Sequence, residues 1–323
     1  MDPMRTRVIV RCVAVLTVIC LTGGWIAQAQ ERPVITKAQV DQWMQDLSNW
    51  GRWGADDQLG AVNLITQAKR REALALATTG EVVSLSLPII VVPAPDDPNA
   101  TAAFTNLRVS TIPSGFLMER QQVAFHGATV SHLDALCHAH HEGKVYNGIP
   151  LEEVFDETGC TQMGISGLAG GIVTRGVLID IPRLKGLDAL ETGTHVYPED
   201  IEAWERRTGV TISAGDAIFL RTGRQVNNNS SGYDITVAPW LKERDVALVG
   251  SDGIQDVGQI RGTALPFHKL VLVALGANIF DNMALEALAE TAARLNRWEF
   301  LLVAAPIPNP GGTGSPLNPL AIF

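Results

Sequence analysis

The sequence contains few cysteines and no unbroken apolar run that could cross a membrane. Four of its 323 residues are cysteine, and Cys12 and Cys20 belong to the N-terminal stretch, which leaves Cys137 and Cys160. Two cysteines do not make a disulfide framework, so we expect a small buried thiol at Cys137 in preference to a bridge to Cys160. The apolar N-terminal run is interrupted at Gly23 and falls short of the roughly 20 residues of a spanning helix.

Clusters of basic residues are also missing. The chain carries 25 Lys and Arg against 34 Asp and Glu, which gives a formal net charge of −9 at pH 7. A surface of this sign repels phosphate backbones, and no stretch of the chain interleaves aromatic residues with Lys or Arg. We therefore expect a small-molecule substrate and no nucleic-acid partner.

Several common catalytic motifs are absent as well. The chain contains no P-loop, no His-Glu-x-x-His, no Gly-x-Ser-x-Gly and no Cys-x-x-Cys. These absences argue against P-loop nucleotide hydrolysis, zincin proteolysis, serine hydrolysis of the α/β-hydrolase type and paired-cysteine chemistry. A cupin-like metal pair at His138 and His140 is also disfavoured, because the glycine and glutamate that should accompany it stand at poor spacing.

The N-terminus has the pattern of a processing signal. Basic residues precede an apolar run over Val13–Ile19, and small residues follow at Ala27 and Ala29. This order is typical of a secretory signal peptide, which we place at residues 1–29. The mature chain, residues 30–323, would then be exported to the periplasm or the extracellular space without stable membrane insertion. An uncleaved anchor is the alternative.

Short apolar strands alternate with amphipathic helical patterns along the mature chain, which is typical of an α/β protein. The strand candidates are Val82–Leu87, Val177–Ile181, Ala217–Arg221, Ala247–Val249 and Leu301–Ala305. The helix candidates are Thr36–Leu47, Gln67–Ala77, Pro198–Arg207, Lys269–Leu275 and Ala284–Leu295. Asn49–Asn63 and Val92–Asn99 are expected to be loops. No fixed-period repeat is visible, so we treat residues 30–323 as one domain.

Histidines crowd into one short segment. Five of the seven, at positions 126, 132, 138, 140 and 141, lie within sixteen residues. On an extended backbone His132 and Asp134 would share one face about 7 Å apart, since each residue rises roughly 3.3 Å. Burying such a pair in an apolar run is costly without compensation, and a metal ion supplies that compensation.

A metal held by His132 and Asp134 needs further ligands from other segments. Imidazole nitrogen and carboxylate oxygen suit Zn or Mn, which take three or more protein ligands. His268 opens an apolar helical stretch and Asp281 follows a probable strand, so both are candidates. For His195 we favour a hydrogen-bonded core position. For His140 and His141 we favour a solvated helix end or loop.

The segment from Ala128 to His138 resembles the signature of the cyclase family, His-x-Gly-Thr-His-x-Asp-x-Pro-x-His. That family includes bacterial kynurenine formamidase and isatin hydrolase. The resemblance continues through Tyr146-Asn-Gly148, Arg221-Thr-Gly223 and the glycine-rich tail from Gly311. It implies a swivelling β/β/α fold with a mixed sheet and flanking helices, a divalent Zn or Mn ion, and assembly as a homodimer or homotetramer.

The resemblance also implies roles for individual residues. Metal ligands would be His132, Asp134, His268 and Asp281, and His138 would be the general acid and base. Two positions depart from the family pattern. Ala128 stands where the family has its first histidine, and Asp281 stands where it has a glutamate. His126 could replace the missing histidine, or the site could hold one ion instead of two.

These features predict a metal-dependent hydrolase of amide-type C–N bonds, in an N-formyl aryl amine or a cyclic amide. The alternatives are a polyketide-type cyclase or lactonase on the same fold, and an exported binding protein that has lost catalysis. Trp53, with Trp50, could stack on a planar substrate or anchor its loop. Arg221 and Ser315 could contact a substrate carboxylate, although Arg221 could equally be a structural salt-bridge donor.

Overall fold

The computed structural model describes residues 32, 34–89, 104–109 and 115–323. The chain divides into two units, Met1–Val34 and Ile35–Phe323, and the description below concerns the second. The predicted signal peptide, residues 1–29, and the predicted loop Val92–Asn99 lie outside the described residues. Within the described part, no helix is both long and apolar enough to cross a membrane.

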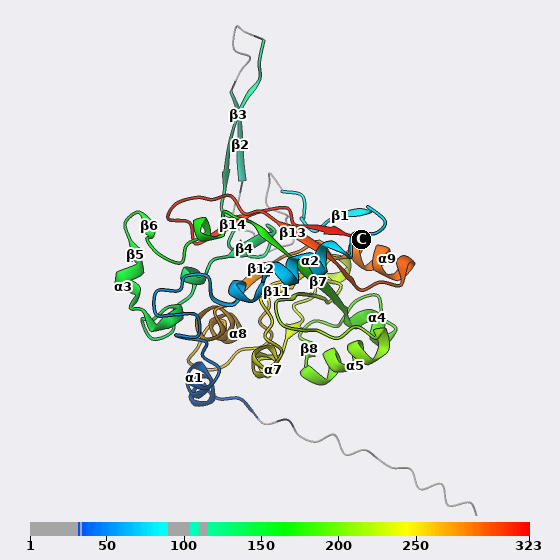
Figure 1. The fold of residues 1–323 in the computed structure, drawn as a ribbon, viewed down its shortest axis with the longest axis horizontal. Helices are drawn as coiled ribbons and strands as arrows, with labels where there is room; N and C mark the ends of the chain where they lie inside the picture. The colour runs from blue at the N-terminus through cyan, green and yellow to red at the C-terminus, as the bar shows by residue number, and fades with distance from the viewer. Residues whose placement is uncertain (1–31, 33, 90–103, 110–114) are drawn as a thin grey trace, which may run out of the picture. The chain divides into compact units, whose positions relative to one another are not determined.

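A nine-stranded mixed sheet forms the centre of the second unit, in the order β1-β15-β13-β7-β9-β11-β12-β4-β14 (Figure 1). Four central strands run parallel: β7 (Ile172–Asp180), β9 (Ala217–Arg221), β11 (Leu248–Ser251) and β12 (Asn278–Asp281). Antiparallel strands flank them: β13 (Glu299–Ala304), β15 (Leu320–Ile322) and β1 (Val82–Ser84) on one side, β4 (His132–Asp134) and β14 (Gly314–Pro316) on the other.

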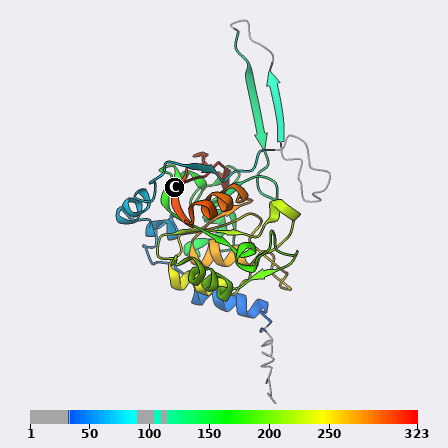
Figure 2. The same ribbon diagram turned by 90° about the vertical axis from the view of Figure 1, so that its right-hand side faces the viewer.

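Three shorter pairings lie outside this sheet. They are β2 (Phe104–Val109) with β3 (Met118–Val123), β5 (Phe155–Asp156) with β6 (Gly159–Cys160), and β8 (His195–Val196) with β10 (Gly232–Tyr233). Figure 2 shows β2 and β3 as a two-stranded ribbon of extended backbone. The β5–β6 hairpin matters for the site, because Cys160 also bridges to Gly311 in the C-terminal tail.

Helices connect and cover the strands. The α-helices are α1 (Lys37–Asp46), α2 (Gln67–Leu74), α3 (Leu151–Val154), α4 (Ile181–Lys185), α5 (Pro198–Thr208), α6 (Arg224–Asn227), α7 (Val237–Arg244), α8 (Pro266–Lys269) and α9 (Glu286–Leu295). The 3-10 turns are η1 (Gly60–Leu64), η2 (Leu136–His138), η3 (Tyr146–Gly148) and η4 (Ile165–Leu168), and a π-helical turn, η5 (Leu270–Leu275), continues α8. The expected α/β class, a mixed sheet with flanking helices, is confirmed.

Local chemistry explains where several of these helices begin. Thr36 and Thr66 cap α1 and α2, since each hydroxyl accepts a hydrogen bond from the backbone N–H three residues later. The predicted helix at Lys269–Leu275 begins earlier, at Pro266, because proline is well suited to a first helical position. All six side chains of η5 are buried, so this helix belongs to the core.

Strand boundaries differ more from the predictions than helix positions do. The strand expected from Val177 begins at Ile172, since its first half contains Thr174 and Arg175 and does not look like a buried strand. Arg175 is accommodated there by ion pairs to Asp216 at 2.6 Å and Glu299 at 2.8 Å. Buried ion pairs of this kind conceal a strand from a search for apolar alternation.

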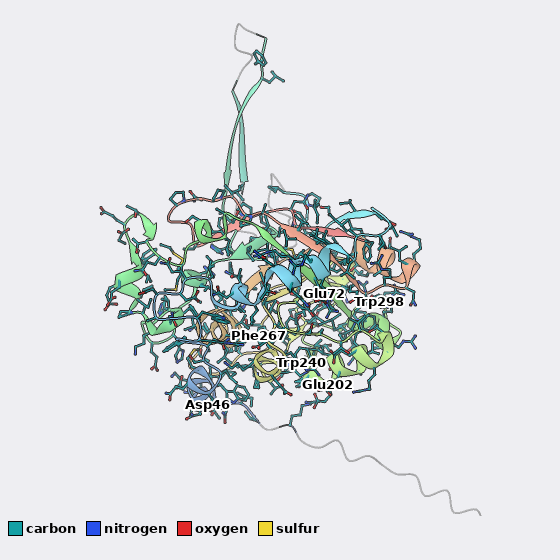
Figure 3. The ribbon with its side chains drawn as sticks, in the orientation of Figure 1. Asp46, Glu72, Glu202, Trp240, Phe267 and Trp298 are labelled. Carbon is teal, nitrogen blue, oxygen red and sulfur yellow. A yellow bond between two sulfur atoms is a disulfide. The ribbon has the colours of Figure 1, made fainter. Side chains whose placement is uncertain are left out.

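The core follows the sheet and the helices against it (Figure 3). Figure 3 labels the buried Phe267 and Trp240, whereas Asp46 and Glu72 are exposed on their helices. Trp298 packs edge-on against a second indole with ring centroids 4.7 Å apart. Both faces of the central strands are buried. The candidate site lies toward one side of this sheet, where β12 pairs with β4.

Candidate metal centre

Strand β4 places His132 and Asp134 on the same face of the sheet. The two residues are separated by one position, and side chains two apart on a strand point to the same side. Strand β12 pairs with β4 so that Asp281 stands directly opposite His132. Helix α8 contributes His268, and each of the four residues is at most 4% exposed. The predicted convergence of two distant segments is therefore present.

Five predicted ligands form two triads that share Asp134. His126, His132 and Asp134 make one, and Asp134, His268 and Asp281 make the other, with the ligand atoms of each triad within 4.8 Å of one another. Oδ1 of Asp134 lies 3.2 Å from Nδ1 of His126 and 3.5 Å from Nε2 of His132. Oδ2 of Asp134 lies 4.0 Å from Nε2 of His268, which is 3.2 Å from Asp281.

Three potential ligand atoms of this cluster lack hydrogen-bond partners. Both carboxylate oxygens of Asp134 and Nδ1 of His126 are buried and make no hydrogen bond of good geometry, although His126 and Asp134 are close enough for an ion pair. Buried polar atoms are normally satisfied, so a set of unsatisfied acceptors that point together fits a cation. The nitrogen and oxygen donors suit Zn or Mn.

Burial raises the pKa of the Asp134 carboxyl, but the surrounding imidazoles of His126, His138, His132 and His268 oppose that effect. The net result is a pKa well below its ordinary value, so Asp134 is an anion in the folded protein. An anionic carboxylate at the junction of both triads provides the charge that a divalent ion needs.

Hydrogen bonds on the far side of each imidazole orient the ligand nitrogens. Nδ1 of His132 lies 2.7 Å from the carbonyl oxygen of Val130, which leaves Nε2 to face the cluster. Nε2 of His126 lies 2.8 Å from Oγ1 of Thr313, which leaves Nδ1 to face it. Such outer partners select the tautomer and hold the ring of a metal-binding histidine.

Three orienting residues were missed by the sequence analysis: Gln255, Asp256 and Thr313. Gln255 donates from Nε2 to Asp281 at 2.9 Å, and Oδ2 of Asp256 lies 2.5 Å from Nδ1 of His268. A carboxylate behind a metal-binding histidine is a common arrangement, but no spacing rule ties Asp256 to His268. Thr313 lies in the glycine-rich tail, where the family resemblance was visible and no role was assigned.

His138 lies at the solvent side of the cluster. Its side chain is 30% exposed, and Nε2 lies 3.9 Å from Oδ2 of Asp134. The ring stacks on His126 with centroids 4.0 Å apart and an angle of 11°. Burial lowers the pKa of His138, and Asp134 only partly offsets this. The neutral imidazole is therefore favoured near pH 7, in the form that accepts a proton.

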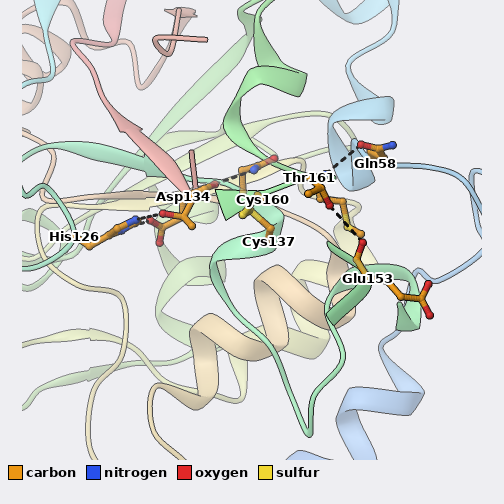
Figure 4. The surroundings of a disulfide bond; sticks show 10 residues. Gln58, His126, Asp134, Cys137, Glu153, Cys160 and Thr161 are labelled. Atoms are coloured by element: carbon orange, nitrogen blue, oxygen red, sulfur yellow. Dashed lines mark hydrogen bonds and ion pairs between the residues drawn. A yellow bond between two sulfur atoms is a disulfide. The ribbon is translucent and has the colours of Figure 1, made fainter. Parts of the chain in front are cut away.

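Cys137 and Cys160 form a disulfide, with Cα atoms 6.4 Å apart, so the expectation of a free buried thiol at Cys137 is wrong (Figure 4). The cysteines are 23 residues apart in sequence. The β5–β6 hairpin brings them together, because Cys160 pairs with Gly311 beside the histidine motif. The bridge links the segment between Asp134 and His138 to this hairpin.

The predicted substrate contacts fare differently. Arg221 is 7% exposed and pairs with Asp180 at 2.9 Å and Glu286 at 2.7 Å. Its guanidinium is therefore a structural salt-bridge donor, and the expected contact to a substrate carboxylate is wrong. Ser315 is buried; its hydroxyl accepts from the Ile307 N–H and donates to the Pro316 carbonyl.

The tryptophan loop is anchored at one of its two aromatic residues. Trp50 donates from its indole nitrogen to the carbonyl oxygen of Val273 at 2.7 Å, as a loop anchor does. Trp53 is half-buried, and the guanidinium of Arg52 lies 4.8 Å from the centre of its ring. Stacking of Trp53 on a substrate stays a prediction.

The remaining histidines have local partners. His195 lies 2.8 Å from Asp234 but is 34% exposed at its side chain, so it is hydrogen-bonded without being a core residue. His140 is exposed, as expected. His141 lies near Asp41 and Glu142, but the ammonium of Lys37 already pairs with both carboxylates and offsets part of their charge.

Comparisons with known proteins show which family and fold this chain shares. A family model described as Putative cyclase matches residues 83–255. The crystal structure of a novel cyclase is 30% identical, covers 85% of this chain and 99% of its own, and superposes with a TM-score of 0.76. A search of curated proteins finds no match.

Two isatin hydrolases share the fold at lower identity. Isatin hydrolase A from Ralstonia solanacearum is 23% identical, with 75% of this chain and 91% of that chain covered and a TM-score of 0.52. An isatin hydrolase bound to the product analogue thioisatinate is 21% identical, with 80% and 99% covered and a TM-score of 0.53. The expected cyclase-like architecture is confirmed.

Proposed function

The chain belongs to the cyclase family, and on that premise we propose that it is a metal-dependent hydrolase. The observation that carries this proposal is the shared carboxylate of Asp134, whose two unsatisfied oxygens face two triads of ligand atoms. His126, His132, Asp134, His268 and Asp281 would hold the ion or ion pair, with Zn or Mn as the expected metal.

A divalent cation supplies Lewis-acid chemistry at such a site, because it polarises a carbonyl group and makes water more acidic. His138 would act as the general base and then as the general acid. Its side chain is partly exposed, its Nε2 lies 3.9 Å from Asp134, and its neutral form would accept a proton from water that attacks the carbonyl carbon. The same nitrogen then returns that proton to the leaving nitrogen, so that an amide is cleaved into a carboxylate and an amine.

The bond that we assign to the substrate is an amide-type C–N bond, in an N-formyl aryl amine or a cyclic amide. The isatin hydrolases that share the fold support this choice, since isatin contains a cyclic amide. The idea that catalysis has been lost depended on Ala128. His126 now weakens it, because its Nδ1 lies 3.2 Å from Asp134 and can stand in for the missing ligand.

We also propose that the protein is exported and works as a homodimer or homotetramer. The Cys137–Cys160 bridge supports export, because disulfides persist in oxidising compartments and are rare in the cytosol. Light scattering of the purified mature chain would give the subunit number. A monomer at micromolar concentration would contradict the oligomer proposal without affecting the hydrolase proposal.

The test of the function is a substrate panel on metal-replete protein. Aryl formamides, isatin and a set of lactones would be assayed with added Zn or Mn, with chelator-treated protein as the control. We expect turnover of at least one amide, loss of it with chelator, and recovery when metal is restored. Turnover of lactones alone would overturn the assignment to C–N bonds. Less than one metal equivalent per chain, with no turnover, would favour a binding protein.

A further inference from the structure

A cavity of about 740 Å³ borders the metal centre at the open edge of the sheet. Gly314 and Pro316 of β14 line it, and they pair with Asp134 and His132 of β4. Directly opposed residues in an antiparallel pair lie on the same face, so this wall of the cavity continues the face that carries the metal ligands.

Phe125 joins the cavity to the cluster from another direction. Its ring lines the cavity and lies 4.4 Å from the ring of His126 and 5.8 Å from that of His132, measured between centroids.

A second cavity, of about 820 Å³, is lined by residues between 254 and 266, including Asp256. Asp256 contacts Nδ1 of His268, whereas the cluster lies at Nε2, so the second cavity reaches Asp256 on the far side of that ring from the cluster.

The described lining of the first cavity is uncharged. Apolar side chains dominate it, namely Ile89, Val123, Phe125, Ile307 and Leu317, together with three prolines. None of the described lining residues is Asp, Glu, Lys, Arg or His. The hydroxyl of Ser315 is fully used within the chain, as an acceptor from Ile307 and a donor to Pro316. The polar side chains of the lining are Ser86, Asn309, Ser315 and Asn318, so no described side chain there carries a charge that could neutralise a charged ligand.

We propose that this cavity receives the part of the substrate beyond the scissile bond, and that this part is an uncharged aryl or branched alkyl group. This inference rests on the proposed hydrolase function and names the substrate class for it. An ionised substituent would lose its water here without gaining a partner of opposite charge, whereas an apolar one gains from leaving water. Ile307, which is 60% exposed at the cavity, becomes a specificity-determining residue.

The test compares two substituents on one aryl formamide, a branched alkyl group and a carboxylate of similar size, with the unsubstituted compound as reference. With metal-replete protein we expect kcat/KM to be at least about tenfold higher for the alkyl compound than for the carboxylate. The Ile307→Asp variant should lose most of that preference, chiefly through a higher KM for the alkyl compound.

A matched control is Leu187→Asp, which makes the same chemical change at another exposed apolar residue, 49% exposed and outside the cavity lining. It should keep the alkyl preference intact. Equal effects of the two variants, or no preference between alkyl and carboxylate compounds, would overturn the proposal. An equal loss of activity on the alkyl and the carboxylate compound in Ile307→Asp would overturn it too, since Ile307 would then not discriminate between them.

Calorimetry separates this inference from the hydrolase proposal. The two corresponding aryl amines, which are products and need no turnover, would be titrated into metal-replete protein. Tighter binding of the alkyl amine, abolished in Ile307→Asp, would support the cavity even if no amide were hydrolysed. Turnover of the unsubstituted formamide without any difference between the amines would leave the hydrolase standing and remove the cavity from substrate recognition.

Discussion

Oδ2 of Asp256 lies 2.5 Å from Nδ1 of His268, and the opposite nitrogen of that ring lies 3.2 Å from Asp281. The same carboxylate accepts hydrogen bonds from the backbone N–H groups of Phe267 and His268. Asp256 therefore both caps α8 and orients the His268 side chain on that helix. Burial lowers the pKa of His268, but the flanking carboxylates of Asp281 and Asp256 outweigh it and raise the pKa well above its ordinary value.

This relationship predicts that Asp256 controls metal affinity. Replacing it with Ala should weaken metal binding by about 10- to 100-fold, as is usual when the partner of a metal-binding histidine is removed. Asp256→Asn is the matched variant, because its amide oxygen can still cap the helix while its charge is gone. Competition with a chromophoric chelator measures the affinity. Unchanged affinity in both variants would assign Asp256 to helix capping alone.

His138 should be needed for turnover and not for metal binding. Its Nε2 is 3.9 Å from Asp134, and its side chain is more exposed than those of His132, Asp134, His268 and Asp281. His138→Ala should lower kcat by about 10² to 10⁴ fold while the metal content stays at that of the unchanged chain. Steady-state kinetics with elemental analysis would check both quantities. Full activity in this variant would remove His138 from the mechanism.

The disulfide should stabilise the folded chain. Closing a loop between Cys137 and Cys160, which stand 23 positions apart, restricts the unfolded state, which is worth about 3 kcal/mol in the chain-entropy model. The Cys137→Ala/Cys160→Ala double variant should unfold at lower urea concentration, with an unfolding free energy reduced by about that amount. A reductant should shift the unchanged chain and leave the double variant unaffected. Coincident curves for all samples would contradict the bridge.

Asp245 predicts a pH-dependent contribution to stability. The hydrogen bond from Arg52, whose guanidinium pairs with Asp245 at 2.5 Å, holds the pKa of this carboxyl below its ordinary value. A group whose pKa is lower when folded stabilises the protein above its unfolded pKa, and that contribution disappears as pH falls through the folded pKa. Both partners are about one-third exposed, so the expected size is at most about 1 kcal/mol at pH 7.

The matched experiment uses Asp245→Asn, because asparagine tolerates the left-handed backbone, φ 52°, at this helix end. Urea unfolding should show the variant less stable at pH 7, and the difference should shrink below about pH 4, near the ordinary pKa of Asp. A difference that is independent of pH would show that Arg52 does not act through the charge of Asp245.

Parts of the fold were readable from the sequence because they depend on neighbours along the chain. The helix at Lys37–Asp46 follows from a capping threonine and an apolar face, and the strand at Ala217–Arg221 follows from a short apolar run. The first half of the strand at Ile172–Asp180 is not predicted by its sequence pattern, because the charge of Arg175 is balanced by acidic partners that lie far away in sequence. Local patterns do not reveal partners of that kind.

The candidate site divides in the same way. The spacing of His132 and Asp134 was sufficient to place both on one face, because side chains alternate along any strand. Strand pairing decided that Asp281 stands opposite His132, and chain packing decided that Thr313 and Asp256 orient two of the histidines. The disulfide was misjudged because a hairpin, and not sequence distance, brings Cys160 beside Cys137.

By itself, the sequence determined the residue types that can bind a metal, the helix and strand periodicities, and the net negative charge on which the expectation of no nucleic-acid partner rests. Only the tertiary structure decided which of those residues meet, that His126 and not Ala128 completes the first triad, and that Arg221 is used in salt bridges. The physical reason is that periodicity acts between neighbours in the chain, whereas coordination and ion pairing act across space and depend on how the sheet orders its strands.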